Sequence, residues 1–144
     1  MYLGINNYGM EDVVNDEAWN DLYKKDAKAV GLGSSVAYAW AGYIFFYFQG
    51  NPYGYGGDYS QNFLKEQSFG KWKQQHIVTI RNTRLDYELY GDDDVRIVRL
   101  GNIRFGYRER YPGNKMSSIL DSVDGRKIIY DDNGRIVKIG YQII

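Results

Sequence analysis

A short internal repeat is the feature that most limits how this chain can fold. The segment RIVRLGN at residues 96–102 recurs as RIVKIGY at residues 135–141, and a weaker copy, KMSSI, occupies residues 115–119. A second pattern precedes each copy, as N-x-R-L-x-Y, N-x-R-F-x-Y and G-x-K-I-x-Y, and ends at Tyr87, Tyr107 and Tyr130. Self-similarity at a spacing of about 20 residues indicates one supersecondary unit that is used three times.

The segments that follow these tyrosines have the composition of tight turns. They are GDDD at 91–94, YPGN at 111–114 and DDNG at 131–134, and Asn-Gly between β-rich runs is a strong hairpin signal. Before the first turn, Leu85 and Tyr87 alternate with polar residues, so one face of the strand is apolar. Residues 81–144 are therefore expected to form at least five antiparallel strands in meander order, with Gly134 at a positive-φ turn position.

The part of the chain before the repeat is expected to be mainly helical, over residues 10–75. Acidic residues precede lysines between residues 11 and 29, which complements the dipole of a helix there. Apolar side chains in this segment recur at three- and four-residue steps. A short second helix is expected within residues 61–75, after a Gly/Tyr-rich loop over residues 49–62.

Residues 29–48 form an uncharged run that is long enough to cross a membrane as a helix. Its glycines, serines and tyrosines favour instead a soluble helix over residues 36–48, buried under the sheet, so membrane contact through 29–48 is not favoured. Two alternatives stay open. One is a membrane-embedded helix, and the other is a pair of strands, because Val36, Tyr38 and Trp40 alternate with alanines.

Together these patterns predict an α+β fold in a single domain over residues 1–144. An N-terminal helical region would pack on a C-terminal antiparallel β-meander of repeated hairpins, over residues 76–144. A length of 144 residues with 44% hydrophobic content is sufficient for one buried core.

The composition excludes several functional classes. Eighteen basic residues balance eighteen acidic ones, so no net field attracts phosphate backbones, and no nucleic-acid partner is expected. The chain has no cysteine and one histidine, His76, which excludes thiolate nucleophiles and sites with several histidine ligands. Phosphate-binding glycine motifs are missing, and the acidic run at 92–94 fits a solvated hairpin turn. No catalytic residue, no metal site and no cofactor is predicted.

One copy of the repeat resembles a known family. The segment YDDNGR at residues 130–135 matches the Y-D-x-x-G-R core of YD (Rhs-type) repeats, and IVKIG at 136–140 is similar to short hairpin repeats of exported bacterial proteins. In the other two copies Glu88 and Arg108 replace the aspartate after the tyrosine. The resemblance implies β-hairpins, a bacterial envelope or extracellular setting, and no catalytic residue. Residues 1–7 do not have the pattern of a secretory signal, which fits a cytoplasmic chain or a mature exported one. With the setting that the resemblance implies, a mature exported or periplasmic chain is favoured over a cytoplasmic one.

Tyrosines supply the predicted binding site. Tyr53, Tyr55 and Tyr59 share the glycine-rich loop with Asp58, and exposed rings of this kind stack on sugar faces or anchor protein contacts. The sequence thus predicts a non-enzymatic bacterial binding or interaction module whose partner is a glycan or a protein. The alternatives are a small carboxylate-dependent hydrolase, lysozyme-like or acting on glycosides, and a membrane-inserting toxin or immunity protein.

Overall fold

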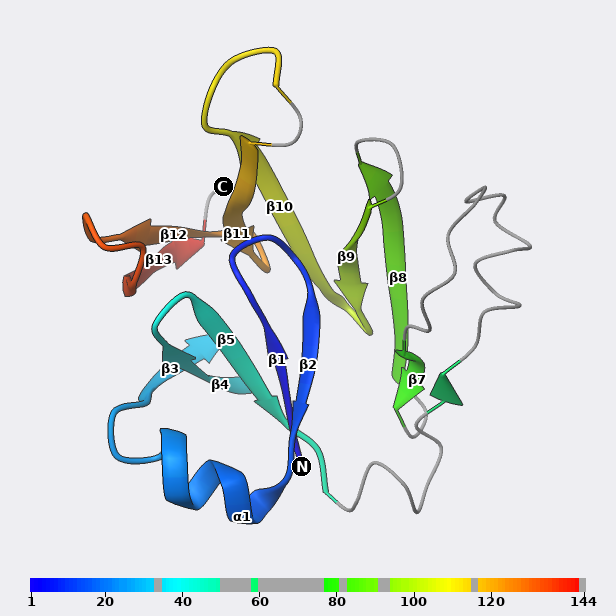
Figure 1. Ribbon diagram of the computed structural model, residues 1–144, viewed down its shortest axis with the longest axis vertical. Coiled ribbons are helices and arrows are strands. Elements are labelled where there is room, and N and C mark those ends of the chain that lie inside the picture. The colour runs from blue at the N-terminus through cyan, green and yellow to red at the C-terminus, as the bar shows by residue number, and fades with distance from the viewer. Residues whose placement is uncertain are drawn as a thin grey trace.

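Two antiparallel sheets make up the chain (Figure 1), seen in a computed structural model that describes residues 1–32, 35–49, 58–59, 77–80, 83–90, 94–114 and 117–142. The first sheet has the strand order β2-β1-β5-β4-β3 and consists of β1 (Tyr2–Ile5), β2 (Glu11–Val14), β3 (Lys28–Leu32), β4 (Ser35–Trp40) and β5 (Tyr43–Tyr47). The second has the order β13 to β6 and consists of β6 (Asp58–Tyr59), β7 (Ile77–Ile80), β8 (Thr83–Tyr90), β9 (Asp94–Leu100), β10 (Ile103–Glu109), β11 (Ser118–Val123), β12 (Arg126–Tyr130) and β13 (Ile136–Gln142).

The strand order of the second sheet follows the chain. Each strand pairs with its sequence neighbours, and all these pairs are antiparallel. This confirms the prediction of at least five antiparallel strands in meander order after residue 81. The repeat was informative because its apolar residues alternate and its turns carry Gly, Asn and Asp.

The prediction of an N-terminal helical region, and with it the α+β fold class, is wrong. Among the described residues, α- and π-helical structure is confined to α1 (Asp16–Ala18) and the π-helical segment η1 (Trp19–Tyr23) that continues it. The flanking residues of the predicted helix belong to β2 and β3. Asn15 caps the short helix, because its side-chain oxygen accepts a hydrogen bond from the Ala18 amide at 2.7 Å. The helix predicted within residues 61–75 lies outside the described residues.

The buried helix predicted over residues 36–48 is also wrong, and the strand pair is what forms. β4 and β5 pair across a turn at Ala41 and Gly42. Ala37 and Ala39 face the core, while Tyr38 and Trp40 join the aromatic residues on the opposite face. The small residues Ala37 and Ala39 thus occupy strand positions that the second sheet covers. No helix in the described part of the chain is long and apolar enough to span a membrane.

The hydrophobic core lies between the two sheets. Phe46 from β5 meets Phe105 from β10 edge to face, with 6.1 Å between ring centroids. Around this contact the inner faces contribute aliphatic side chains that are fully buried, among them Leu3, Ile5, Ile44, Leu85, Ile97 and Leu120.

Three backbone hydrogen bonds join the second sheet to turns of the first. The turn between β1 and β2 accepts two of them, from the Ile97 amide to the Gly9 carbonyl (2.9 Å) and from the Leu120 amide to the Asn7 carbonyl (2.7 Å). The Ile136 amide donates the third to the Ala41 carbonyl. The donors belong to β9, β11 and β13, and Figure 1 shows the end of the β1–β2 hairpin reaching towards β10 and β11.

The sheet can accept the β1–β2 turn because its strands diverge there. Between β9 and β10 the ladder contains only the pairs Leu100–Ile103 and Arg99–Arg104. Beyond them, the Tyr107 hydroxyl bridges the gap and donates a hydrogen bond to the Ile97 carbonyl. In this gap the Gly9 carbonyl takes the place of a ladder partner for the Ile97 amide. The Leu120 amide belongs to β11, whose ladder with β12 is likewise limited to Ser122–Lys127 and Val123–Arg126.

The repeated tyrosine has the same structural role in two units. The Tyr130 hydroxyl donates to the Leu120 carbonyl at 2.7 Å, and Tyr107 bonds to Ile97, in both cases ten residues earlier in the chain. Ile97 and Leu120 are also the residues whose amides bind the β1–β2 turn. In each case one residue of the preceding strand is held through both of its backbone polar groups, the carbonyl by the tyrosine of the unit and the amide by the β1–β2 turn.

The turn between β12 and β13 explains the Asp and Gly of the Y-D-x-x-G-R segment. One side-chain oxygen of Asp131 accepts hydrogen bonds from the amides of Asn133 (2.8 Å) and Arg135 (3.0 Å). Gly134 has a φ of +78°, which confirms the predicted positive-φ position. Aspartate closes the turn and glycine relieves its backbone strain.

We predict that Gly9→Ala destabilises the fold by about 2–4 kcal/mol, through positive-φ strain and overpacking. Gly9 has a φ of +84°, and a Cβ there would meet the Tyr107 hydroxyl and lie 2.7 Å from Cβ of Arg96. The control is Gly113→Ala, because Gly113 has a φ of +83° with no atom within 4 Å of the added Cβ. Urea unfolding should give a loss of about 1 kcal/mol for the control. Equal losses would show that the turn is not tightly enclosed.

We predict that Tyr130→Phe lowers stability by about 1 kcal/mol at neutral pH, since the hydroxyl hydrogen bond is lost. Burial raises the pKa of Tyr130 in the folded protein; Arg108 opposes this shift and Asp121 adds to it. Above the unfolded value of 10.0, the unfolded chain releases this proton first, so Tyr130 loses its stabilising contribution as pH rises.

The stability difference between wild type and Tyr130→Phe should therefore narrow in urea titrations at increasing pH above about 10. Tyr111→Phe is the control, since Tyr111 is 66% exposed. A difference that stays constant with pH would contradict the assignment.

Candidate functional site

An open groove of about 1050 Å³ lies where one end of the first sheet meets β8, β9 and β10. The first sheet supplies an apolar wall that consists of Leu32, Val36, Phe46, Tyr47 and Phe48. The second sheet supplies a polar wall with Thr83, Arg84, Asp86, Arg99 and Asp124, together with the β9–β10 turn. The groove therefore combines an aromatic surface with charged groups of both signs.

Tyr47 is the aromatic residue that the apolar wall presents to solvent. Its side chain is 50% exposed, and its ring makes an edge contact with Tyr2, with 5.0 Å between centroids. Tyr2 in turn stacks on Trp19 at 4.0 Å with an interplanar angle of 13°. Because Trp19 is buried, this stack supports the exposed ring from behind.

The rings behind Tyr47 form one cluster on the outer face of the first sheet. Its members are Tyr2, Trp19, Tyr23, Tyr38, Trp40, Tyr43 and Phe45. Burial, with smaller contributions from Tyr38, Asp16 and Tyr47, raises the pKa of Tyr2. Gly4 lets the cluster pack closely, since a Cβ at that position would lie 2.9 Å from a carbon of the Phe45 ring.

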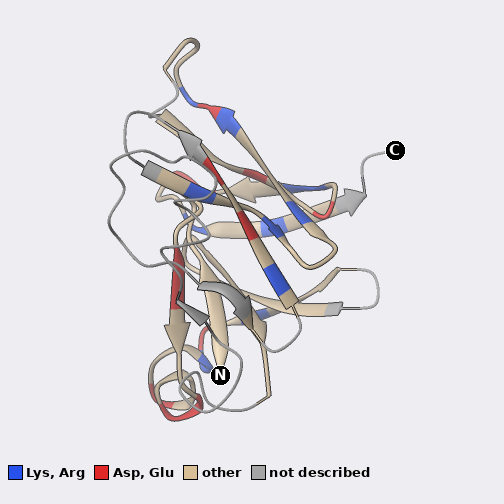
Figure 2. Ribbon diagram, turned by 90° about the vertical axis from the view of Figure 1, so that its right-hand side faces the viewer, with Lys and Arg blue, Asp and Glu red and all other residues tan. Residues whose placement is uncertain are grey.

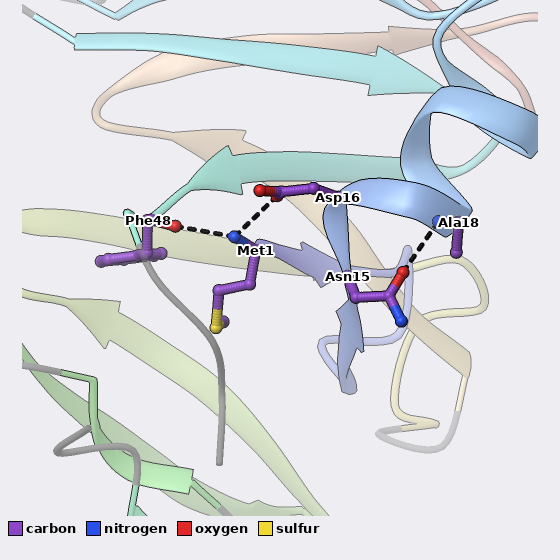
Figure 3. A network of polar contacts seen from close by, with 5 residues as sticks. All are labelled: Met1, Asn15, Asp16, Ala18 and Phe48. Atoms are coloured by element: carbon purple, nitrogen blue, oxygen red, sulfur yellow. Dashed lines mark hydrogen bonds and ion pairs between the residues drawn. The ribbon is translucent and has the colours of Figure 1, made fainter. Parts of the chain in front are cut away.

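A polar network holds the end of the apolar wall (Figure 3). The amine of Met1 donates a hydrogen bond to the Phe48 carbonyl at 2.8 Å and lies 2.9 Å from a carboxylate oxygen of Asp16. The Met1 side chain is 1% exposed. The contact ties the residue that follows β5 to β1 and to the first turn of the helix.

The polar wall is organised by pairs of charged residues. Nε of Arg84 donates to a carboxylate oxygen of Asp86 at 2.7 Å. Nε of Arg99 donates to the Gly101 carbonyl at 2.7 Å, and Asp86 is the cross-strand partner of Arg99. Figure 2 shows charges of both signs along the strands of the second sheet, whereas β1, β4 and β5 carry no charged residue.

The β9–β10 turn holds the polar wall in place. Gly101 has a φ of +58°, and its amide donates to the Arg84 carbonyl at 2.8 Å. A Cβ at Gly101 would lie 3.2 Å from the methyl carbon of Thr83. Close packing of the turn on β8 therefore sets the position of Arg99 relative to Arg84.

The binding site predicted from sequence falls largely outside the described residues. Tyr53 and Tyr55 are outside the described residues, as is His76, while Asp58 and Tyr59 form β6, which pairs with β7. The prediction for this loop therefore stays a prediction. Within the described ranges, no group of three or more His, Cys, Asp or Glu residues is placed to hold a metal ion.

Sequence reasoning did not identify the groove. Tyr47 belongs to the uncharged segment 36–48, for which the sequence predicts a helix. A helix does not indicate on which face of a strand Tyr47 lies. The alternation of polar and apolar residues predicts that Arg84 and Asp86 lie on the polar face of a strand, and it is the one sequence signal for the groove. The groove itself depends on contact between segments far apart in the chain, which no local pattern specifies.

Comparison with known proteins gives no relative from which to transfer a function. No family model matches the chain, and neither does any curated protein or solved structure.

Proposed function

We propose that this protein is a non-enzymatic binding module whose ligand is a glycan held in the groove between the two sheets. One observation carries the proposal, namely that Tyr47, whose side chain is half exposed, and the ion-paired Arg84 and Asp86 line one groove. Sugars present apolar C–H faces that stack on aromatic rings, and hydroxyl groups that need both donors and acceptors.

The shape of the groove supports a glycan over a protein partner. Its volume of about 1050 Å³ is close to the upper end of small-ligand sites, which span roughly 300–1,000 Å³. A protein partner typically requires about 800 Å² on each side, spread over a flatter surface. A concave site of this volume has room for a few sugar units.

The charged residues of the groove favour binding over hydrolysis. Glycosidases place two carboxylates on either side of the scissile bond. Here one oxygen of Asp86 is engaged by Arg84, so this carboxylate is a structural acceptor in the polar wall. The resemblance to YD repeats supports placing the module in a bacterial envelope or extracellular setting.

We expect Tyr47→Ser to weaken glycan binding by about 3- to 10-fold, the loss anticipated for one stacking contact. An array of soluble neutral and acidic oligosaccharides would identify a ligand, and calorimetry would then give the affinities. Tyr111→Ser is the matched control, because Tyr111 is 66% exposed and does not line the groove. Unchanged binding by Tyr47→Ser, or no binding to any glycan, would overturn the proposal.

A second variant distinguishes binding in the groove from binding by the Gly/Tyr-rich loop, which is the site predicted from sequence. Replacement of Tyr53, Tyr55 and Tyr59 by serine should leave binding intact if the groove is the site. If this triple variant loses binding while Tyr47→Ser retains it, the loop is the binding site and the groove assignment is wrong.

A further inference from the structure

Two arginines lie side by side at the edge of the groove, where Arg99 belongs to the polar wall and Arg104 lies next to it outside the lining. Arg99 of β9 and Arg104 of β10 are cross-strand partners, and both side chains are exposed. Cross-strand partners point to the same face of a sheet, and like charges in this arrangement are destabilising. The pair therefore works against folding unless something compensates for it.

The neighbouring carboxylates do not neutralise this pair. Asp86 is next to Arg99 in the same cross-strand row, but one of its oxygens is bound to Arg84. Across the residues that the structure describes, no ion pair involves the guanidinium of Arg99 or Arg104. The groove lining contains Arg84, Arg99, Asp86 and Asp124, and Arg104 beside it adds a third guanidinium to two carboxylates, although the chain as a whole has a net charge of zero.

We infer that the ligand is an acidic glycan, whose carboxylate or sulfate group binds between Arg99 and Arg104. This inference rests on the proposed glycan-binding function and adds the chemical class of the ligand. An anion between the two guanidiniums replaces their repulsion with two charge-assisted interactions, and the planar fork of arginine suits carboxylate and sulfate oxygens.

The geometry of Arg99 supports its role in this subsite. Its Nε is committed to the Gly101 carbonyl, which anchors the guanidinium beside the groove and leaves its terminal NH₂ groups as donors for a ligand. Arg104 is held through its backbone, because its carbonyl accepts a hydrogen bond from the Asp124 amide at 2.8 Å. Both arginines thus start from fixed positions on a hairpin.

The test compares acidic sugars with their neutral counterparts. The first pair of probes is a galacturonic acid trimer and its methyl ester, and the second is a sulfated galactose trimer and its unsulfated form. Binding to wild type, Arg99→Gln, Arg104→Gln and Arg110→Gln is measured by calorimetry at two salt concentrations. Arg110 is the control, since it is an exposed arginine beyond the end of β10 and gives the same change in net charge.

We expect wild type to bind at least one acidic probe about tenfold or more tightly than its neutral counterpart. Arg104→Gln should abolish that preference and leave the affinity for the neutral probe unchanged, because Arg104 lies outside the groove lining. Arg99→Gln should weaken binding of the acidic probe more than binding of the neutral one. The preferred acidic probe identifies the anion as carboxylate or sulfate. The urea midpoint of Arg104→Gln should equal or exceed that of wild type, because a like-charge pair is removed, so loss of binding cannot be attributed to unfolding.

The possible failures are distinguishable. Equal affinity for acidic and neutral probes, unaffected by either arginine variant, would overturn the inference and leave the proposed function standing. An equal loss in Arg110→Gln would also overturn it, because the attraction would then be non-specific. If neither these probes nor the oligosaccharide array gives any binding, the proposed glycan-binding function itself fails.

Discussion

The contact of the β1–β2 turn with β9 and β11 of the second sheet is the interaction on which the rest of the structure depends. Ile97 and Leu120 are fully buried, and their amides have the carbonyls of Gly9 and Asn7 as partners. Without that turn, each amide would be buried and unsatisfied, at a cost of about 1–3 kcal/mol. The first sheet is thus required for the second to keep its divergent shape, and the two sheets form one cooperative unit.

The strand pair β9–β10 contributes both to the contact with the β1–β2 turn and to the groove. β9 and β10 stay paired only near their turn, at Leu100–Ile103 and Arg99–Arg104. At the open end they hold the β1–β2 turn, and at the closed end the turn at Gly101 packs on β8 and forms part of the polar wall.

Sequence patterns predict the meander of the second sheet but do not predict the strands of the first. The meander follows from local patterns, since alternation and turn residues such as Gly134 specify hairpins without reference to the rest of the chain. The segment 36–48 is different, because small residues on one side and rings on the other suit a helix or a strand pair equally. The strand pair forms because both faces of this segment are covered. Ala37 and Ala39 lie under the second sheet, while Tyr38 packs near Trp19. The gap between β9 and β10 depends on residues about ninety positions apart in the chain, and no single segment encodes it.

Tyrosine richness suggested a binding surface, and the structure shows how the described tyrosines are used instead. The hydroxyls of Tyr107 and Tyr130 bond to backbone carbonyls inside the second sheet, and Tyr2 is part of the cluster around Trp19. Abundance of an amphipathic residue therefore does not locate a site, because the same hydroxyl that binds a ligand can satisfy an unpaired carbonyl. Tyr47 differs in its surroundings. Its ring is supported from behind, half exposed, and placed across a groove from charged groups, and this combination is the reason to assign it to binding.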